Sequence, residues 1–198
     1  MQNVAILGAT GSIGKSTLGV LELYPDKFRL YAVTAHSRVK ELAEIAKRFN
    51  VSLAVTSDPS KLEALKEALA AIGCNARAEA GAEAVARLAA SPEVDIVVGA
   101  IVGAAGIVST FRAAEAGKKL LLANKESVVC GGKLLMDTVK RCGATLMPVD
   151  SEHNAIFQCL VGETERSREK ARIILTASGG PFRTRKDLSD VTIEEATH

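Results

Sequence analysis

The sequence holds little that would indicate a secreted, membrane or nucleic-acid-binding protein. It has no Trp, aromatic residues make up only 4%, and the four Cys residues form no Cys-x-x-Cys pair. The cysteines therefore indicate a reduced chain without a zinc or disulfide framework. The formal net charge of +2 is too small to predict binding to nucleic acid or to a membrane surface.

Targeting and membrane signals are missing as well. The longest mostly apolar run, residues 96–108, contains three glycines and is shorter than the roughly 18 residues that a membrane helix needs. The N-terminal residues show no basic stretch followed by an apolar run and a cleavage site. We therefore expect no secretory signal and a cytoplasmic location.

Small aliphatic residues, in contrast, are plentiful, and hydrophobic residues make up 47% of the 198. That composition suits parallel strands buried between two layers of helices. Strand-like segments at 4–7, 29–34, 51–55, 76–80, 95–101, 120–123 and 144–149 alternate with helix-like ones at 12–23, 38–49, 62–72, 82–90, 107–116 and 131–142. We therefore predict an α/β fold, a Rossmann-like and mostly parallel sheet flanked by helices, over residues 1–149.

The pattern changes after residue 149. Residues 151–160 read as a short helix, 164–170 as a charged turn and 172–176 as a strand, and Thr192 begins a capped helix in the polar tail. This segment is too small to bury a core of its own. We interpret residues 150–198 as the truncated start of an α+β catalytic domain.

The strongest motif is Gly8-Ala-Thr-Gly11-Ser-Ile-Gly14, which follows the first strand and opens the first helix. Glycines at these positions permit a tight turn, close approach of a pyrophosphate and packing of helix on strand. The free N–H groups at the helix N-terminus favour an anion. The motif therefore predicts a dinucleotide site. A nucleoside-triphosphate loop ending in Gly14-Lys15-Ser16 is the weaker reading, because its opening glycine is replaced by Ala9.

The end of the second strand favours NADPH over NADH. An NAD site usually has an acid there, about 20 residues past the glycines, to bind the ribose 2′-hydroxyl. This chain has His36-Ser37-Arg38 instead, and these donors suit a 2′-phosphate.

Two polar segments follow later strands, where open α/β sheets bind their ligands. They are Leu122-Ala-Asn-Lys-Glu-Ser127 and Pro148-Val-Asp-Ser-Glu-His-Asn154. Asp150 and Glu152 are oxygen ligands suited to Mg²⁺ or Mn²⁺. The alternative is an acidic cluster that favours the start of a helix.

Taken together, five segments resemble motifs of the 1-deoxy-D-xylulose 5-phosphate reductoisomerase family, both in their residues and in their order along the chain. They are the glycine loop, Ala100-Ile-Val-Gly-Ala-Ala-Gly106, the two polar segments and Ser178-Gly-Gly-Pro-Phe-Arg183. The resemblance implies NADPH- and metal-dependent conversion of 1-deoxy-D-xylulose 5-phosphate to 2-C-methyl-D-erythritol 4-phosphate in non-mevalonate isoprenoid biosynthesis. It also implies a small phosphorylated substrate and, at full length, a homodimer.

The resemblance also assigns residues, by motif position. It implies cofactor contacts at Thr10, Gly11, Ser12, Ile13, His36, Ser37, Arg38, Asn124 and Glu126, and metal ligands at Asp150 and Glu152. It implies substrate contacts at Lys125, Ser151, Glu152, Ser178 and His198, with Lys125 and Glu152 catalytic. Family members are about twice as long, so we expect this chain to be an N-terminal fragment that is inactive alone.

Two alternatives stay open on the sequence. One is an aspartate-semialdehyde-type dehydrogenase, which shares the glycine loop and would need a nucleophile such as Cys130. The other is a non-catalytic NADP-binding module, for which Asp150 and Glu152 would have no purpose.

Overall fold

The structure, a computed structural model, describes residues 1–174, 182 and 184–197. Its contacts divide the chain into two units, Met1–Phe157 and Gln158–His198.

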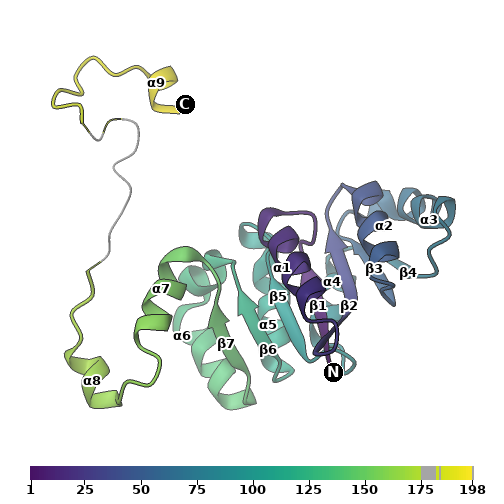
Figure 1. The fold of residues 1–198 in the computed structure, drawn as a ribbon, viewed down its shortest axis with the longest axis horizontal. Coiled ribbons are helices and arrows are strands. Elements are labelled where there is room, and N and C mark those ends of the chain that lie inside the picture. Colours follow the sequence, from purple (N-terminus) through teal and green to yellow (C-terminus); the bar gives the residue numbers. More distant parts are fainter. Residues whose placement is uncertain (175–181, 183, 198) are drawn as a thin grey trace. The chain divides into compact units, whose positions relative to one another are not determined.

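The first unit is built on a parallel sheet of seven strands (Figure 1). The strand order is β4-β3-β2-β1-β5-β6-β7, and every neighbouring pair is parallel. The strands are β1 (Gln2–Leu7), β2 (Phe28–Ala35), β3 (Leu53–Thr56), β4 (Arg77–Ala80), β5 (Ile96–Gly99), β6 (Lys119–Leu122) and β7 (Thr145–Pro148). This confirms the predicted Rossmann-like fold.

Helices cover both faces of this sheet. They are α1 (Ser12–Leu23), α2 (Val39–Arg48), α3 (Leu62–Ala71), α4 (Ala82–Ala90), α5 (Ile107–Glu115) and α6 (Lys125–Cys142), with short 3₁₀ turns at Pro59–Lys61 and Ala104–Gly106. Side chains of α1, α2 and α3 share one buried cluster with Val4 and Ile6. Those of α4, α5 and α6 share a second cluster with Ala5 and Leu7. Helix α7 (Ser151–Cys159) follows β7 and contributes to neither buried cluster.

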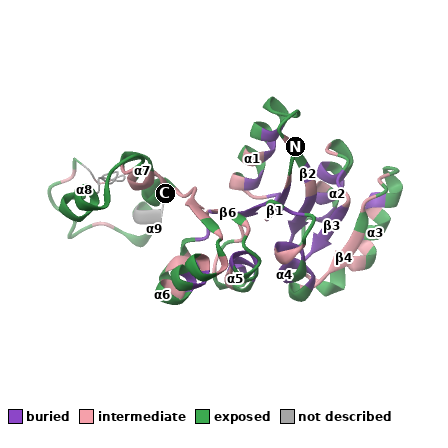
Figure 2. Cartoon of the chain, turned by 90° about the horizontal axis from the view of Figure 1, so that it is seen from below, coloured by how far each residue is buried: buried purple, intermediate pink, exposed green. Residues whose placement is uncertain are grey.

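The alternation along β1 explains why this strand is central. Successive side chains point to opposite faces of a sheet, so an apolar run such as Val4–Leu7 supplies both clusters. All four of these residues are buried, and Figure 2 shows buried residues along the strands and exposed ones on the outer helix surfaces.

The order of the strands also sets the position of the site. Strands β2, β3 and β4 follow one another outward from one side of β1, and strands β5, β6 and β7 follow one another outward from its other side. The carboxyl ends of β1 and β5 therefore flank a topological switch point, where sheets of this kind bind ligands. The glycine loop follows β1 at this point.

Three local predictions were wrong. Helix α6 begins at Lys125 rather than near 131, because the Asn124 side chain accepts a hydrogen bond from the Ser127 N–H and caps it; the helix is interrupted at Gly132. Residues 165–170 are a helix, α8 (Glu165–Lys170), capped by Thr164, instead of a turn. The strand predicted at 172–176 is not formed by its described residues 172–174.

In the second unit, the predicted start of a helix at Thr192 is confirmed. Helix α9 spans Ile193–Thr197, and the Thr192 hydroxyl accepts a hydrogen bond from the Glu195 N–H at 3.2 Å. Across the described part of the chain, no helix combines the length and apolar character needed to cross a bilayer.

Candidate functional site

The loop between β1 and α1 requires two of its glycines for steric reasons. Gly8 has a φ of +95°, and a Cβ there would lie 2.7 Å from the carbonyl oxygen of Ala100. A Cβ on Gly14 would lie 2.5 Å from the carbonyl oxygens of Gly8 and Ala9. Both distances are shorter than van der Waals contact. This confirms the predicted need for glycine at the turn and where α1 packs on β1.

Gly11, the middle glycine of the motif, lies in a more open position. Among the described residues, a Cβ on Gly11 would approach only the Gly8 carbonyl oxygen, at 3.4 Å. Gly11 is also the N-cap of α1, where no described side chain caps the helix and the first turn holds no acid. The N–H groups of this turn and the positive end of the helix dipole therefore fit a pyrophosphate.

Thr34, at the end of β2, holds this loop in place. Its hydroxyl accepts a hydrogen bond from the Gly8 N–H at 3.0 Å, and its carbonyl accepts one from the Ala9 N–H at 2.8 Å. Thr34 is buried. This role was not predicted from the sequence, although a Thr as the last polar residue of an apolar strand is a visible signal.

The predicted 2′-phosphate residues follow directly after β2, and all three are exposed. The His36 carbonyl accepts a 2.6 Å hydrogen bond from the Thr56 hydroxyl, and the His36 Nδ1 lies 2.9 Å from the Ser57 Oγ. Arg38 is the N-cap of α2. Thr34 lies two residues before His36 and binds the Gly8 and Ala9 N–H groups, so this segment begins beside the glycine loop.

The carboxylate of Asp58 lies near His36. Side-chain and backbone hydrogen bonds from Ser60 hold the pKa of Asp58 below its usual value, with a smaller contribution from the charge of His36. Glu41 contacts Arg38 directly, and this contact was not predicted from the sequence either.

Asn124 lies after β6 and is buried with its amide fully engaged. Its Nδ2 donates to the carbonyls of Ile101 and Gly103 at 2.7 and 2.9 Å, and also to Glu126. Its Oδ1 accepts from the Ser127 N–H at 2.7 Å. Asn124 therefore joins the loop after β5 to the start of α6, and Glu126 supports it.

Of the other predicted cofactor residues, Thr10 is buried, Ser12 is exposed and Ile13 packs partly against the core of the α1 face. Lys125, Ser151 and Glu152 are all exposed at the first turns of α6 and α7.

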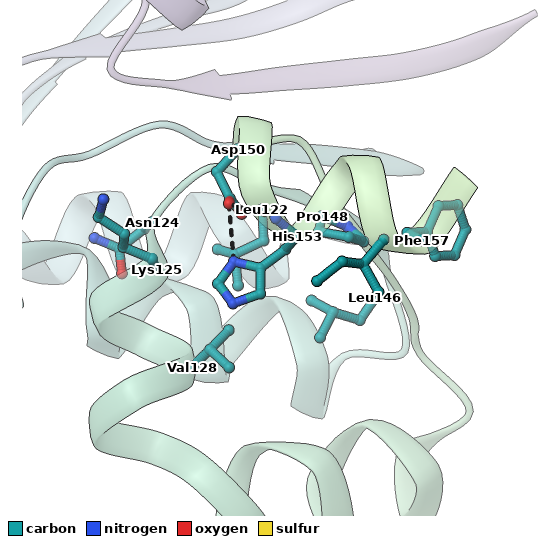
Figure 3. Close-up of a pocket in the computed structure, with 10 residues that line it drawn as sticks. Leu122, Asn124, Lys125, Val128, Leu146, Pro148, Asp150, His153 and Phe157 are labelled. Carbon is teal, nitrogen blue, oxygen red and sulfur yellow. Dashed lines mark hydrogen bonds and ion pairs between the residues drawn. The ribbon is translucent and has the colours of Figure 1, made fainter. Parts of the chain in front are cut away.

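A pocket of about 250 Å³ lies beside these first turns, at the carboxyl ends of β6 and β7 (Figure 3). Its lining is mostly apolar and is formed by Leu122, Asn124, Lys125, Val128, Leu146, Pro148, Asp150, His153, Ile156 and Phe157. Lys125 and Asp150, both predicted site residues, therefore line the same pocket.

Asp150 is engaged with its own helix. Its Oδ1 accepts hydrogen bonds from the backbone N–H of His153 at 3.0 Å and from the His153 ring at 2.8 Å, the contact drawn in Figure 3. Partial burial, the largest single influence, raises the pKa of Asp150, but the bonds from His153 together outweigh it and the pKa is lowered. The carboxylate is therefore ionised at neutral pH.

The carboxylates of Asp150 and Glu152 suit a divalent cation in kind. Mg²⁺ and Mn²⁺ prefer oxygen ligands, but two carboxylates alone leave most of the coordination shell to water and substrate. Within the described residues, no group of three or more His, Cys, Asp or Glu side chains could hold a metal. By themselves these two residues would supply only part of a metal site. Ser178 and His198, the remaining predicted substrate residues, lie outside the described residues.

Comparison with known proteins identifies a family. The family profile described as 1-deoxy-D-xylulose 5-phosphate reductoisomerase matches residues 4–132, and the profile for the C-terminal domain of the same enzyme matches residues 146–198. The reductoisomerase of Pseudomonas putida (strain W619) is 48% identical over 201 residues, covering 99% of this chain and 51% of the relative.

Solved structures give the same result. The Zymomonas mobilis reductoisomerase in complex with NADPH is 50% identical, with a TM-score of 0.85 over 93% of this chain and 47% of that one. A reductoisomerase in complex with NADPH, fosmidomycin and magnesium is 47% identical, with a TM-score of 0.77 over 80% of this chain and 39% of that one.

The chain thus spans about half the length of the curated relatives it matches. The matches favour neither the nucleoside-triphosphate loop nor the semialdehyde dehydrogenase, whose required nucleophile, Cys130, is an exposed residue of α6. The chain belongs to the 1-deoxy-D-xylulose 5-phosphate reductoisomerase family.

Proposed function

We propose that this chain provides the NADPH-binding part, and the start of the catalytic part, of an enzyme that converts 1-deoxy-D-xylulose 5-phosphate to 2-C-methyl-D-erythritol 4-phosphate. The observation that carries the proposal is the glycine loop, where the steric demands of Gly8 and Gly14 leave Gly11 and the start of α1 open to an anion. The complexes of relatives with NADPH support it.

In this proposal the cofactor residues divide into three groups. Thr10, Gly11, Ser12 and Ile13 bind the pyrophosphate through the start of α1, and His36, Ser37 and Arg38 bind the 2′-phosphate. Asn124 and Glu126 act through the loop after β5, since the Asn124 amide is committed to the Ile101 and Gly103 carbonyls. The bound cofactor supplies the hydride.

The substrate residues lie at the other end of the site. Lys125 is an exposed cation on the rim of the pocket and would bind the phosphorylated substrate together with Ser151, Glu152, Ser178 and His198. Asp150 and Glu152 would hold Mg²⁺ or Mn²⁺, and polarisation of the substrate's hydroxyl and carbonyl oxygens is the chemistry that such an ion supplies.

We also propose that turnover requires sequence beyond this chain, because the chain spans about half of its relatives. By itself it binds NADPH and is inactive. The division into residues 1–149 and 150–198, the cytoplasmic location and a homodimer of the full-length enzyme are parts of the same proposal.

Titration of the 198-residue chain with NADPH and with NADH, followed by nucleotide fluorescence, tests the binding function. We expect NADPH to bind at least about tenfold more tightly, a difference of about 1.4 kcal/mol. A chain that binds ATP but not NADPH would contradict the proposal. Oxidation of NADPH by this chain with 1-deoxy-D-xylulose 5-phosphate would contradict its inactivity.

A further inference from the structure

Three charged side chains form a small network beside the glycine loop. The Lys15 Nζ lies 2.9 Å from Oε1 of Glu41, and the Arg38 Nη1 lies 3.3 Å from Oε2 of the same carboxylate. Each oxygen of Glu41 thus contacts one cation. The Glu41 side chain is 30% exposed, and the two cations are 58% and 56% exposed, so both remain accessible from solvent.

The network joins the two segments to which the proposed function assigns phosphates. Lys15 lies in the first turn of α1, and Arg38 caps α2 after β2. A cation in the first turn of a helix opposes the helix dipole and is unfavourable without an anion nearby. Glu41 is that anion in this structure, and its own position in the first turn of α2 is favoured by the dipole.

We infer that Glu41 is a specificity-determining residue that limits the preference of this site for NADPH over NADH. The inference rests on the proposed function, since it concerns the 2′-phosphate that Arg38 would bind. A phosphate that approaches Arg38 must displace the Glu41 carboxylate or share the guanidinium with it, and the two anions repel each other. NADH has no 2′-phosphate and avoids this competition.

The competition is measurable but limited in size. All three side chains are partly exposed, so water and salt weaken their interactions. We therefore expect Glu41→Gln, which keeps the side-chain shape and removes the charge, to raise the ratio of NADPH affinity to NADH affinity by about tenfold at low ionic strength. The increase should shrink toward about twofold near 0.5 M salt, because the Debye length falls to a few ångströms.

Glu22→Gln is the matched control. Glu22 pairs with Arg48, so this ion pair also joins α1 and α2. It and the Lys15–Glu41 pair line the same groove between the two helices. The substitution removes the same charge and an equivalent bridge without contact to Arg38. We expect the affinity ratio to change by less than about twofold, given the screening of distant surface charges.

A double-mutant cycle with Arg38→Ala tests whether Glu41 acts through Arg38. Without the guanidinium, Glu41→Gln should change the ratio by less than about twofold. The inference is overturned if Glu41→Gln leaves or lowers the ratio in the parent chain, or if the full increase persists without Arg38. If the parent chain does not prefer NADPH at all, the proposed function fails instead, so the two failures are distinguishable.

Discussion

At the scale of single residues, the site depends on side chains that shape the backbone as much as on those that would contact a ligand. Thr34 and Asn124 are both buried, and both use their polar atoms to hold loops after parallel strands. A buried hydrogen bond of this kind contributes little net stability, but leaving its partner unpaired costs about 1–3 kcal/mol. Such residues should therefore be sensitive to isosteric substitution.

We predict that Thr34→Val destabilises the chain by about 1–3 kcal/mol and weakens NADPH binding. Valine keeps the shape and burial of the side chain but leaves the Gly8 N–H without its acceptor. Urea unfolding measures the free energy, and fluorescence titration measures the affinity.

The control for this prediction is Thr17→Val. The Thr17 hydroxyl donates to the Ile13 carbonyl within α1, an acceptor that the helix already uses. We expect a change within about 0.5 kcal/mol. Equal effects of the two substitutions would show that Thr34 has no special role in holding the glycine loop.

At the scale of elements, helix α1 contains two glycines with opposite roles. Gly14 is buried against the loop carbonyls, whereas a Cβ placed on Gly19 would meet no described atom within 4 Å outside its own stretch of helix backbone. We predict that Gly14→Ala destabilises the chain by about 1–3 kcal/mol, because backbone atoms must shift to admit the methyl group. Gly19→Ala should stabilise it by about 1 kcal/mol, the difference in helix propensity.

Thermal or urea unfolding of the two variants checks this pair, and each serves as the control for the other. Gly14→Ala should also weaken NADPH binding, while Gly19→Ala should leave the affinity unchanged. A stable Gly14→Ala variant with normal affinity would mean that the tight contact of α1 with the loop is not needed for the site.

Much of the fold could be predicted because its signals are local. Alternating apolar strands and periodic helices indicate a parallel α/β sheet, and glycines mark the turns. The start of α6 was misplaced because Asn124 was read for its chemistry and not as a helix cap. The helix at 165–170 was missed because its residues are all polar and show no apolar periodicity.

The site was less predictable where partners lie far apart in the sequence. Thr34 and Gly8, or Lys15 and Glu41, are separated by 26 residues, and only the pairing of β1 with β2 brings them together. The same holds for Asn124, whose acceptors follow a different strand. Motifs can predict the glycine loop and the acidic pair, but contacts between segments that follow different strands can be recognised only once the fold is known.

At the scale of the whole molecule, cofactor binding and metal binding should be separable in this chain. The proposed cofactor residues follow β1, β2 and β6, which are complete elements of the first unit. The proposed metal ligands supply two carboxylates, and the described residues hold no cluster of three. The chain should therefore bind cofactor well and metal poorly.

We predict that NADPH at about 100 times its Kd stabilises the 198-residue chain by about 2.7 kcal/mol. For a chain of this size each kcal/mol raises Tm by about 2–4 °C, so the expected shift is about 5–10 °C.

Mg²⁺ or Mn²⁺ at about 1 mM should give no shift in Tm, because two carboxylates and water form a weak site. The variant Asp150→Asn/Glu152→Gln should keep the NADPH shift, since asparagine still caps α7. A metal-induced shift that this variant abolishes would show instead that the chain holds a complete metal site.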